Sequence, residues 1–246
     1  MYVRTFGREG DPPVLLLHGG GVAGWMWDPT RERLGGGLRS IVPDLPGHDR
    51  GADEPYRSHA RTVEELGALI EKERPGGRVA VVGFSLGAQL AVLLAADRPD
   101  LVDRVMVVSA QAVPTPAPGL ILGLLGATAG LARREWFARL QAKELFVPES
   151  LMADYIRTSS GVSKQTLLAA VGENIRFTVP SGWARFPGTA HVLVGARERR
   201  VMRNSGRALH EALPTALLET VEGCGHGVPL QRPEWFAGRL REWLDA

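Results

Sequence analysis

The sequence predicts an α/β fold with a mostly parallel central sheet that is flanked by helices and carries a helical insertion. Three observations predict it. Short apolar runs typical of buried strands alternate with stretches of helical length and periodicity. One of these runs turns directly into a helix through Gly83-Phe84-Ser85-Leu86-Gly87. A long segment, 112–188, has helical patterns but no strong strand, and it separates two of the later strands.

Length and composition restrict the class of protein. The chain has 246 residues, enough for one large α/β domain or a core with an inserted lid. Its net charge is +2 with arginines spread along the chain, so no nucleic acid or membrane partner is expected. The single cysteine, Cys224, excludes a disulfide framework and fits a reducing compartment. Residues 1–7 lack a signal peptide's apolar run, so we expect a cytoplasmic protein.

The first strands are expected to lead into a glycine-rich loop. Residues 2–6 alternate like an edge strand, and residues 14–17 form a second apolar run that continues into His18-Gly19-Gly20-Gly21. Glycines at the carboxyl end of a strand let backbone N–H groups approach a ligand closely. We therefore expect the N–H of Gly20 to bind an oxyanion, with a flexible turn as the alternative.

The next segment is expected to supply a short helix, a strand and a longer helix. Residues 25–34 predict the short helix, and residues 38–42 predict a strand that ends in a polar loop. Thr62 and Glu65 have the spacing of a capping box, which would start the longer helix.

Ser85 is the candidate nucleophile. Residues 79–82 predict a buried strand and 88–96 a helix, so the glycine-flanked serine lies at a sharp strand-to-helix turn. Such a turn strains its central residue and exposes that side chain at the positive end of the helix. The flanking glycines are expected because a Cβ there would collide with the neighbouring strand or helix. The backbone N–H of Leu86 faces the same space and is expected to stabilise an oxyanion.

Residues 112–188 are expected to form a helical lid between a strand at 103–108 and one at 189–195, with one of its helices over 133–146. Long insertions at strand ends commonly cover an active site. A helical layer without a gating role is the alternative. The expected domains are a core of 1–111 and 189–246 and a lid of 112–188. Composition predicts an apolar substrate pocket that includes Trp25, Trp136, Phe137, Met152 and Trp183.

The end of the chain is expected to complete the sheet and to supply a base. Residues 200–213 predict a helix, 216–221 the last strand, and 232–244 an amphipathic C-terminal helix. His226 lies in the glycine-rich loop between that strand and that helix. A serine hydroxyl is a weak nucleophile until a base takes its proton, and a loop in this place can carry a histidine to Ser85.

These motifs together resemble the α/β-hydrolase superfamily over essentially the whole chain. The matching segments are His18-Gly19-Gly20, Asp44-Leu45-Pro46-Gly47-His48, Gly83-Phe84-Ser85-Leu86-Gly87, the helical insertion, Val192-Leu193-Val194-Gly195 and Gly223-Cys224-Gly225-His226. The resemblance implies the chain order nucleophile, acid, histidine, with Ser85 first and His226 last.

The resemblance places the acid three residues after Gly195, at Glu198. The family's other acid position, just after the strand that ends at Val108, holds Ser109-Ala110-Gln111 and no carboxylate. Three arginines, 197, 199 and 200, surround Glu198, so a surface ion pair is the alternative role. Glu222 is the fallback acid.

The resemblance implies a serine hydrolase, esterase- or lipase-like, that cleaves a small or medium apolar carboxylic ester through an acyl-enzyme. Ser85, His226 and Glu198 would form the triad, and the N–H groups of Gly20 and Leu86 the oxyanion hole, with no metal and no cofactor. The expected partner is a small-molecule substrate, and the protein a monomer or homodimer. The alternatives are a C–C bond hydrolase, a lactonase or a menaquinone-pathway-like lyase on the same triad, and a low-turnover small-molecule binding protein.

Overall fold

A seven-stranded sheet runs through the computed structural model, which describes residues 1–130 and 134–246, in the order β1-β3-β2-β4-β5-β6-β7. The strands are β1 (Tyr2–Phe6), β2 (Pro13–Leu17), β3 (Arg39–Asp44), β4 (Val79–Phe84), β5 (Val102–Val108), β6 (Thr189–Gly195) and β7 (Leu217–Val221). Edge strand β1 pairs with β3 antiparallel, and the remaining neighbours pair parallel. The mostly parallel sheet predicted from the alternating pattern is therefore confirmed.

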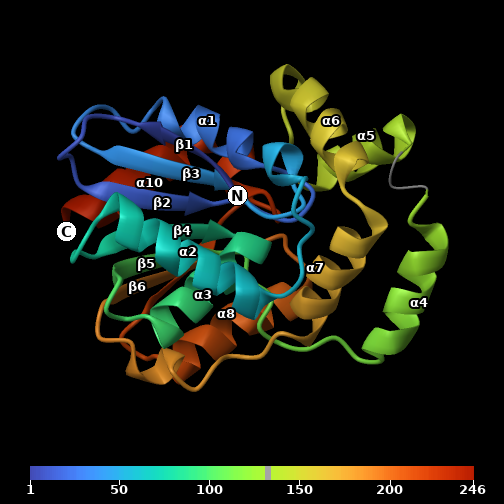
Figure 1. The fold of residues 1–246 in the computed structure, drawn as a ribbon. Helices are drawn as coiled ribbons and strands as arrows, with labels where there is room; N and C mark the ends of the chain where they lie inside the picture. Colours follow the sequence, from blue (N-terminus) through green and yellow to red (C-terminus); the bar gives the residue numbers. More distant parts are fainter. Residues whose placement is uncertain (131–133) are drawn as a thin grey trace.

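Helices cover both faces of this sheet (Figure 1). One face carries α2 (His59–Glu73), α3 (Leu86–Asp97) and α8 (Arg200–Ala212), and the other carries α1 (Asp28–Arg31) and α10 (Pro233–Asp245). Alternate residues of β2 serve the two faces, because successive side chains of a strand point in opposite directions. Leu15 and Leu17 belong to one buried core, whereas Val14 and Leu16 belong to the other.

The starts of two helices differ from the sequence prediction. The helix expected over 25–34 is split into a 3-10 turn, η1 (Gly24–Trp27), and the short α1. The prediction of a capping box at Thr62 and Glu65 was wrong. Ser58 caps α2 one turn earlier, where its side chain accepts a hydrogen bond from the backbone N–H of Arg61 at 3.2 Å. Thr62 lies within the helix and donates its hydroxyl to the carbonyl of Ser58 at 2.9 Å.

Between β5 and β6 the chain leaves the sheet. It forms α4 (Pro118–Thr128), α5 (Glu135–Glu144), η4 (Glu149–Leu151), α6 (Met152–Gly161), α7 (Lys164–Arg176) and η5 (Trp183–Arg185). Helices α4 to α7 stand at the carboxyl ends of the strands (Figure 1). The helix expected over 133–146 is present as α5, and its expected first residue, Arg133, lies outside the described residues.

Two further short elements lie in loops on the strands' carboxyl side. They are η2 (Asp49–Gly51), which follows β3, and α9 (Val228–Gln231), which follows β7. Across the described ranges, every helix falls short of the length or apolar character needed to cross a membrane.

Candidate active site

Ser85 occupies the turn between β4 and α3 in a strained conformation, with φ of 52° and ψ of −110°. A positive φ is costly for a residue with a side chain and persists where the surroundings impose it. A Cβ built on Gly83 would lie 2.2 Å from the carbonyl oxygen of Gly87, and one on Gly87 would lie 2.4 Å from that of Leu17. The tight crossing of strand and helix therefore requires both glycines, and it leaves the Ser85 side chain partly exposed.

The structure brings His226 to Ser85, although the two residues are 141 positions apart in the chain. His226 Nε2 lies 3.0 Å from Ser85 Oγ, and His226 Nδ1 lies 2.9 Å from Glu198 Oε2. A carboxylate only accepts hydrogen bonds, so the imidazole donates from Nδ1 and its Nε2 is free to accept from the serine hydroxyl. This arrangement suits proton transfer from Ser85 to the ring.

Glu198 is held by more than the imidazole. Its Oε1 accepts from the hydroxyl of Ser109 at 2.6 Å and from the backbone N–H of Gly195 at 2.9 Å. The residue is only 5% exposed. These contacts fix the carboxylate plane in a buried position that faces His226.

The other acids and the neighbouring arginines take different positions. Within the described part of the chain, no arginine pairs with the Glu198 carboxylate, although Arg203 donates to its backbone carbonyl. Glu222, the fallback acid, is exposed. Glu198 is thus the carboxylate that the fold places beside the His226 ring.

Gly20 and Leu86 are the two residues whose backbone N–H groups are predicted to bind an oxyanion. Gly20 and Leu86 both line the cavity that contains Ser85. Leu86 is the first residue of α3, so its N–H has no acceptor within the helix. Among the described residues no backbone carbonyl accepts from Gly20 either. Both N–H groups are therefore available to an anionic ligand, as the predicted oxyanion role requires.

The loop that carries Gly20 is fixed by a buried histidine. His18 donates from Nδ1 to the carbonyl of Gly19 at 2.7 Å, and its Nε2 accepts from the N–H of Leu45 at 2.8 Å. Burial lowers the pKa of His18 to about 4, so the ring is neutral near pH 7. His18 therefore stabilises the conformation of the loop.

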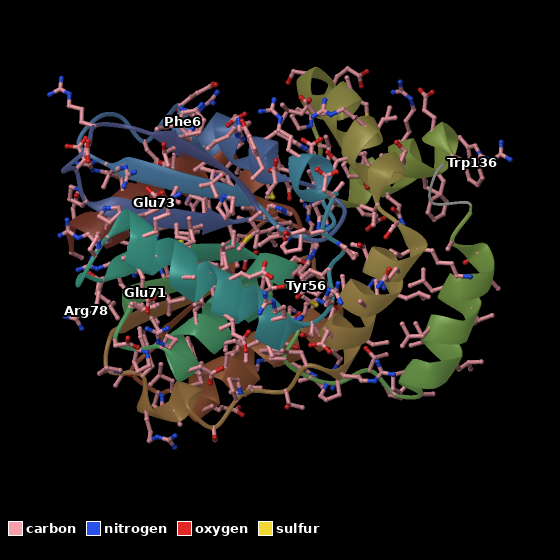
Figure 2. All side chains as sticks on the ribbon, in the orientation of Figure 1. Phe6, Tyr56, Glu71, Glu73, Arg78 and Trp136 are labelled. Carbon is pink, nitrogen blue, oxygen red and sulfur yellow. The ribbon has the colours of Figure 1, made fainter. Side chains whose placement is uncertain are left out.

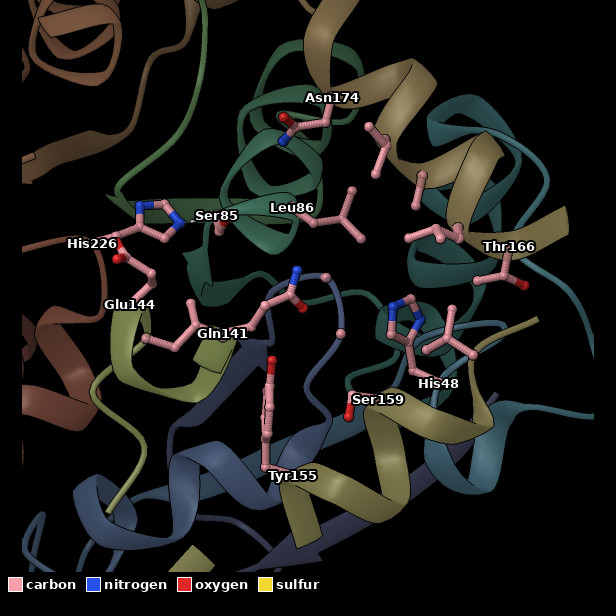
Figure 3. Close-up of a pocket in the computed structure, with 17 residues that line it drawn as sticks. His48, Ser85, Leu86, Gln141, Glu144, Tyr155, Ser159, Thr166, Asn174 and His226 are labelled. Atoms are coloured by element: carbon pink, nitrogen blue, oxygen red, sulfur yellow. Dashed lines mark hydrogen bonds between the residues drawn. The ribbon is translucent and has the colours of Figure 1, made fainter. Parts of the chain in front are cut away.

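Ser85 opens into a cavity of about 370 Å³ beneath the inserted helices (Figure 3). Such a volume suits a small molecule. Apolar lining comes from Leu86, Leu145, Val162, Leu167, Ala170 and Val171, and polar lining from His48, Gln141, Tyr155 and Asn174. Figure 3 places His226 and Glu144 at one end of the cavity and His48 and Thr166 at the other.

The five residues predicted to line the pocket are all described, and none of them lines this cavity. Trp25 is buried against Thr158, to whose hydroxyl its Nε1 donates at 3.0 Å. Trp183 is fully buried and donates to the carbonyl of Leu209 at 2.9 Å. Trp136 projects outward with 61% exposure (Figure 2), in edge contact with Phe137, and Met152 packs against a core cluster. Composition did not distinguish a residue that faces the cavity from one that faces the core or the outside.

The sequence analysis missed several residues beside Ser85. Ser109 donates a hydrogen bond to Glu198. It occupies the family's other acid position, just after β5, and that position was the one sequence feature that could have indicated its role. Asn174 of α7 lines the cavity and donates to Gln89 Oε1 at 3.1 Å, which ties the insertion to α3. Tyr155 and Glu144 carry no comparable sequence signal. The helices that contain them were predicted, but the sequence did not indicate which face of each helix lies toward Ser85. Within the described ranges, no group of three or more His, Cys, Asp or Glu side chains could hold a metal ion.

Comparisons with known proteins agree with this architecture. A family model described as the alpha/beta hydrolase family matches residues 14–239. An uncharacterised protein of Mycobacterium tuberculosis is 27% identical over 275 residues, covering 99% of this chain and 79% of that protein. A pimeloyl-[acyl-carrier protein] methyl ester esterase of Nitrosospira multiformis is 36% identical over 113 residues, covering 44% of this chain and 41% of the esterase. The structure of an esterase from Exiguobacterium antarcticum superposes with a TM-score of 0.87 at 20% identity, covering 100% and 95% of the two chains.

Proposed function

The chain belongs to the alpha/beta hydrolase family, and we propose that it is a serine hydrolase that cleaves small or medium carboxylic esters with an apolar acyl group through an acyl-enzyme. The observation that carries this proposal is the hydrogen-bonded series Ser85, His226 and Glu198, which opens on a mostly apolar cavity. A nucleophile, a base and a group that orients the base are the parts that acyl transfer requires.

In the proposed acylation step, Ser85 Oγ attacks the ester carbonyl carbon while its proton passes to His226 Nε2. Glu198 stabilises the imidazolium that results, and the N–H groups of Gly20 and Leu86 receive the oxyanion. The tetrahedral intermediate then collapses, its bond to the alcohol oxygen breaks, and His226 gives the proton to that oxygen. Water, deprotonated by His226, attacks the acyl-enzyme in the same way and releases the carboxylic acid and the free Ser85 hydroxyl.

We further propose that residues 112–188 act as a lid on a core formed by 1–111 and 189–246. Leu145 follows α5, Tyr155 belongs to α6 and Leu167 to α7, and all three line the cavity beside Ser85. An acyl group in this cavity would contact the insertion over much of its surface. The insertion is therefore the part of the chain from which acyl-chain preference is expected.

A carboxylic ester as the substrate class has support from a relative. The Nitrosospira multiformis protein that matches 44% of this chain is a methyl ester esterase by its name. The apolar lining of the cavity agrees with an ester whose acyl side is apolar, because burying apolar surface favours binding.

The test is turnover of p-nitrophenyl esters from acetate to decanoate, with Ser85→Ala as the matched variant. We expect the wild type to hydrolyse part of this series and Ser85→Ala to keep the fold with under about one percent of the turnover. A variant that folds normally and retains more than that would contradict the role of Ser85. Absence of wild-type turnover on every ester, with tight binding of the same compounds, would instead favour the low-turnover binding protein.

A further inference from the structure

Ser85 and His226 lie at the junction of two cavities. The second cavity also measures about 370 Å³ and shares Ser85, Glu144, Asn174 and His226 with the first. Its remaining wall comes from the segment after β6 and the start of α8, with Arg197, Arg199 and Met202 among its residues. The site therefore has two compartments that meet at the proposed nucleophile.

The proposed chemistry assigns the two parts of an ester to these compartments. The leaving alcohol must lie beside His226, because the imidazole returns a proton to the alcohol oxygen. His226 lines both cavities, but its partner Glu198 and its chain neighbour Gly225 line the second cavity and not the first. Gly20 and Leu86, the proposed oxyanion donors, line the first cavity. The first cavity thus suits the acyl group and the second suits the alcohol.

The alcohol compartment carries two available guanidinium groups. Arg197 and Arg199 are exposed, and within the described residues neither side chain forms an ion pair or a side-chain hydrogen bond. The nearby carboxylate of Glu198 is already engaged by His226, Ser109 and Gly195. Arginine presents a planar set of donors that matches a carboxylate or a phosphate.

From this arrangement we propose that the natural substrate is an ester whose leaving alcohol bears an anionic group, a carboxylate or phosphate, bound by Arg197 and Arg199. The inference rests on the proposed function, because His226 defines the alcohol side. It extends that function by fixing the charge of the leaving group. The apolar first cavity and the cationic second one would then select the two ends of one substrate.

Glu144 opposes this charge and supplies an internal check. This exposed residue ends α5, lines both cavities and forms no ion pair within the described residues. Its negative charge would repel an anionic group held near the junction. Removing that charge is expected to raise the preference for an anionic alcohol, whereas removing the arginines is expected to lower it.

The test compares esters with one acyl group and alcohols of different charge. The anionic substrates are 4-(butyryloxy)benzoate and 4-(butyryloxy)phenyl phosphate, and the neutral reference is 4-(butyryloxy)benzamide. For the wild type we expect kcat/KM to be higher for at least one anion by about tenfold or more, the scale of a charge-assisted hydrogen bond. The anion with the larger ratio identifies whether carboxylate or phosphate is preferred. High salt should reduce the ratio.

Three variants decide the assignment. The double variant Arg197→Gln/Arg199→Gln should lower the anionic-to-neutral ratio by about tenfold, and Glu144→Gln should raise it. The control is Arg207→Gln, which removes an exposed arginine of α8 that hydrogen-bonds to Asn204 and lines neither cavity, so the ratio should stay unchanged.

Two results would overturn the assignment. One is a wild-type ratio at or below one for both anions, and the other is an unchanged ratio in the double variant. Loss of benzamide-ester turnover in Ser85→Ala separates these failures from a failure of the proposed function. If the neutral ester depends on Ser85 but charge has no effect, the hydrolase proposal stands and the anionic substrate class falls.

Discussion

Replacing Glu198 by glutamine tests the role of the carboxylate through the geometry of its contacts. Two donors, the Ser109 hydroxyl and the Gly195 N–H, both point to Oε1, while His226 Nδ1 meets Oε2. A glutamine amide satisfies those donors by placing its oxygen at the Oε1 position. Its NH₂ group then faces His226 Nδ1, which must become the acceptor. The proton of the ring moves to Nε2, where it blocks acceptance of the Ser85 proton.

The size of the effect follows from the cost of the opposite amide orientation. The Ser109 hydroxyl can rotate and accept, but the Gly195 N–H can only donate, so the flipped amide leaves a buried donor unpaired. That costs about 2 kcal/mol, or about 30-fold in the competent population. Loss of the negative charge beside the imidazolium adds to this. We expect kcat to fall by about 10³ to 10⁴, a scale known for the equivalent change in a serine protease.

The assay is kcat at saturating p-nitrophenyl butyrate, measured together with the melting temperature. The control is Glu222→Gln, because Glu222 is exposed and should leave both values unchanged. A Glu198→Gln protein that folds normally and loses less than about tenfold in kcat would refute the reasoning, because the amide would then have served as well as the carboxylate.

Acid should destabilise the fold, because burial lowers the pKa of His18 to about 4 and that of His48 to about 3. Above the unfolded-state pKa near 6.5 both rings are neutral whether the protein is folded or unfolded, so they do not reduce the free energy of unfolding. As the pH falls below that value, the unfolded state binds protons that the folded state does not, which lowers the free energy of unfolding by about 2 kcal/mol per ring at pH 5. Urea unfolding at pH 7.5 and 5 measures this difference, and equal stabilities would contradict it. Leu167→Trp, in the cavity wall, should lower kcat/KM for octanoate esters by about tenfold or more while acetate changes little. Trp136→Ala should leave both within about twofold because the side chain is 61% exposed, and a shifted chain-length preference would show that it reaches the substrate.

The sheet and the proposed nucleophile were predictable because their signals are local. The strand, turn and helix around Ser85 each carry their own pattern, and the two glycines have a steric reason that sequence alone suggests. Ser58 shows how even a local signal can be misread, because it caps α2 one turn before Thr62, the residue that the capping-box pattern indicated. The start of this helix is set by the hydrogen bond that Ser58 accepts from the Arg61 N–H, which the spacing of Thr62 and Glu65 did not reveal.

The surroundings of the site were less predictable because they depend on which way a helix faces. Trp183 and Trp136 look equally suitable for a pocket, yet one is fully buried and the other is mostly exposed. Ser109 was noted only for lacking a carboxylate, and its hydroxyl is what holds Glu198. Such roles arise from tertiary contacts between distant segments, here from the pairing of β5 with β6, which brings the residues after the two strands together.

The most direct test of the central claim is covalent trapping of Ser85. A fluorophosphonate probe is incubated with the wild type and with Ser85→Ala, and intact mass followed by peptide mapping locates the adduct. We predict one adduct per chain, on Ser85, formed rapidly in the wild type and absent from the variant. A folded wild-type protein that stays unlabelled, or one labelled at another residue, would contradict the claim that Ser85 is an activated nucleophile.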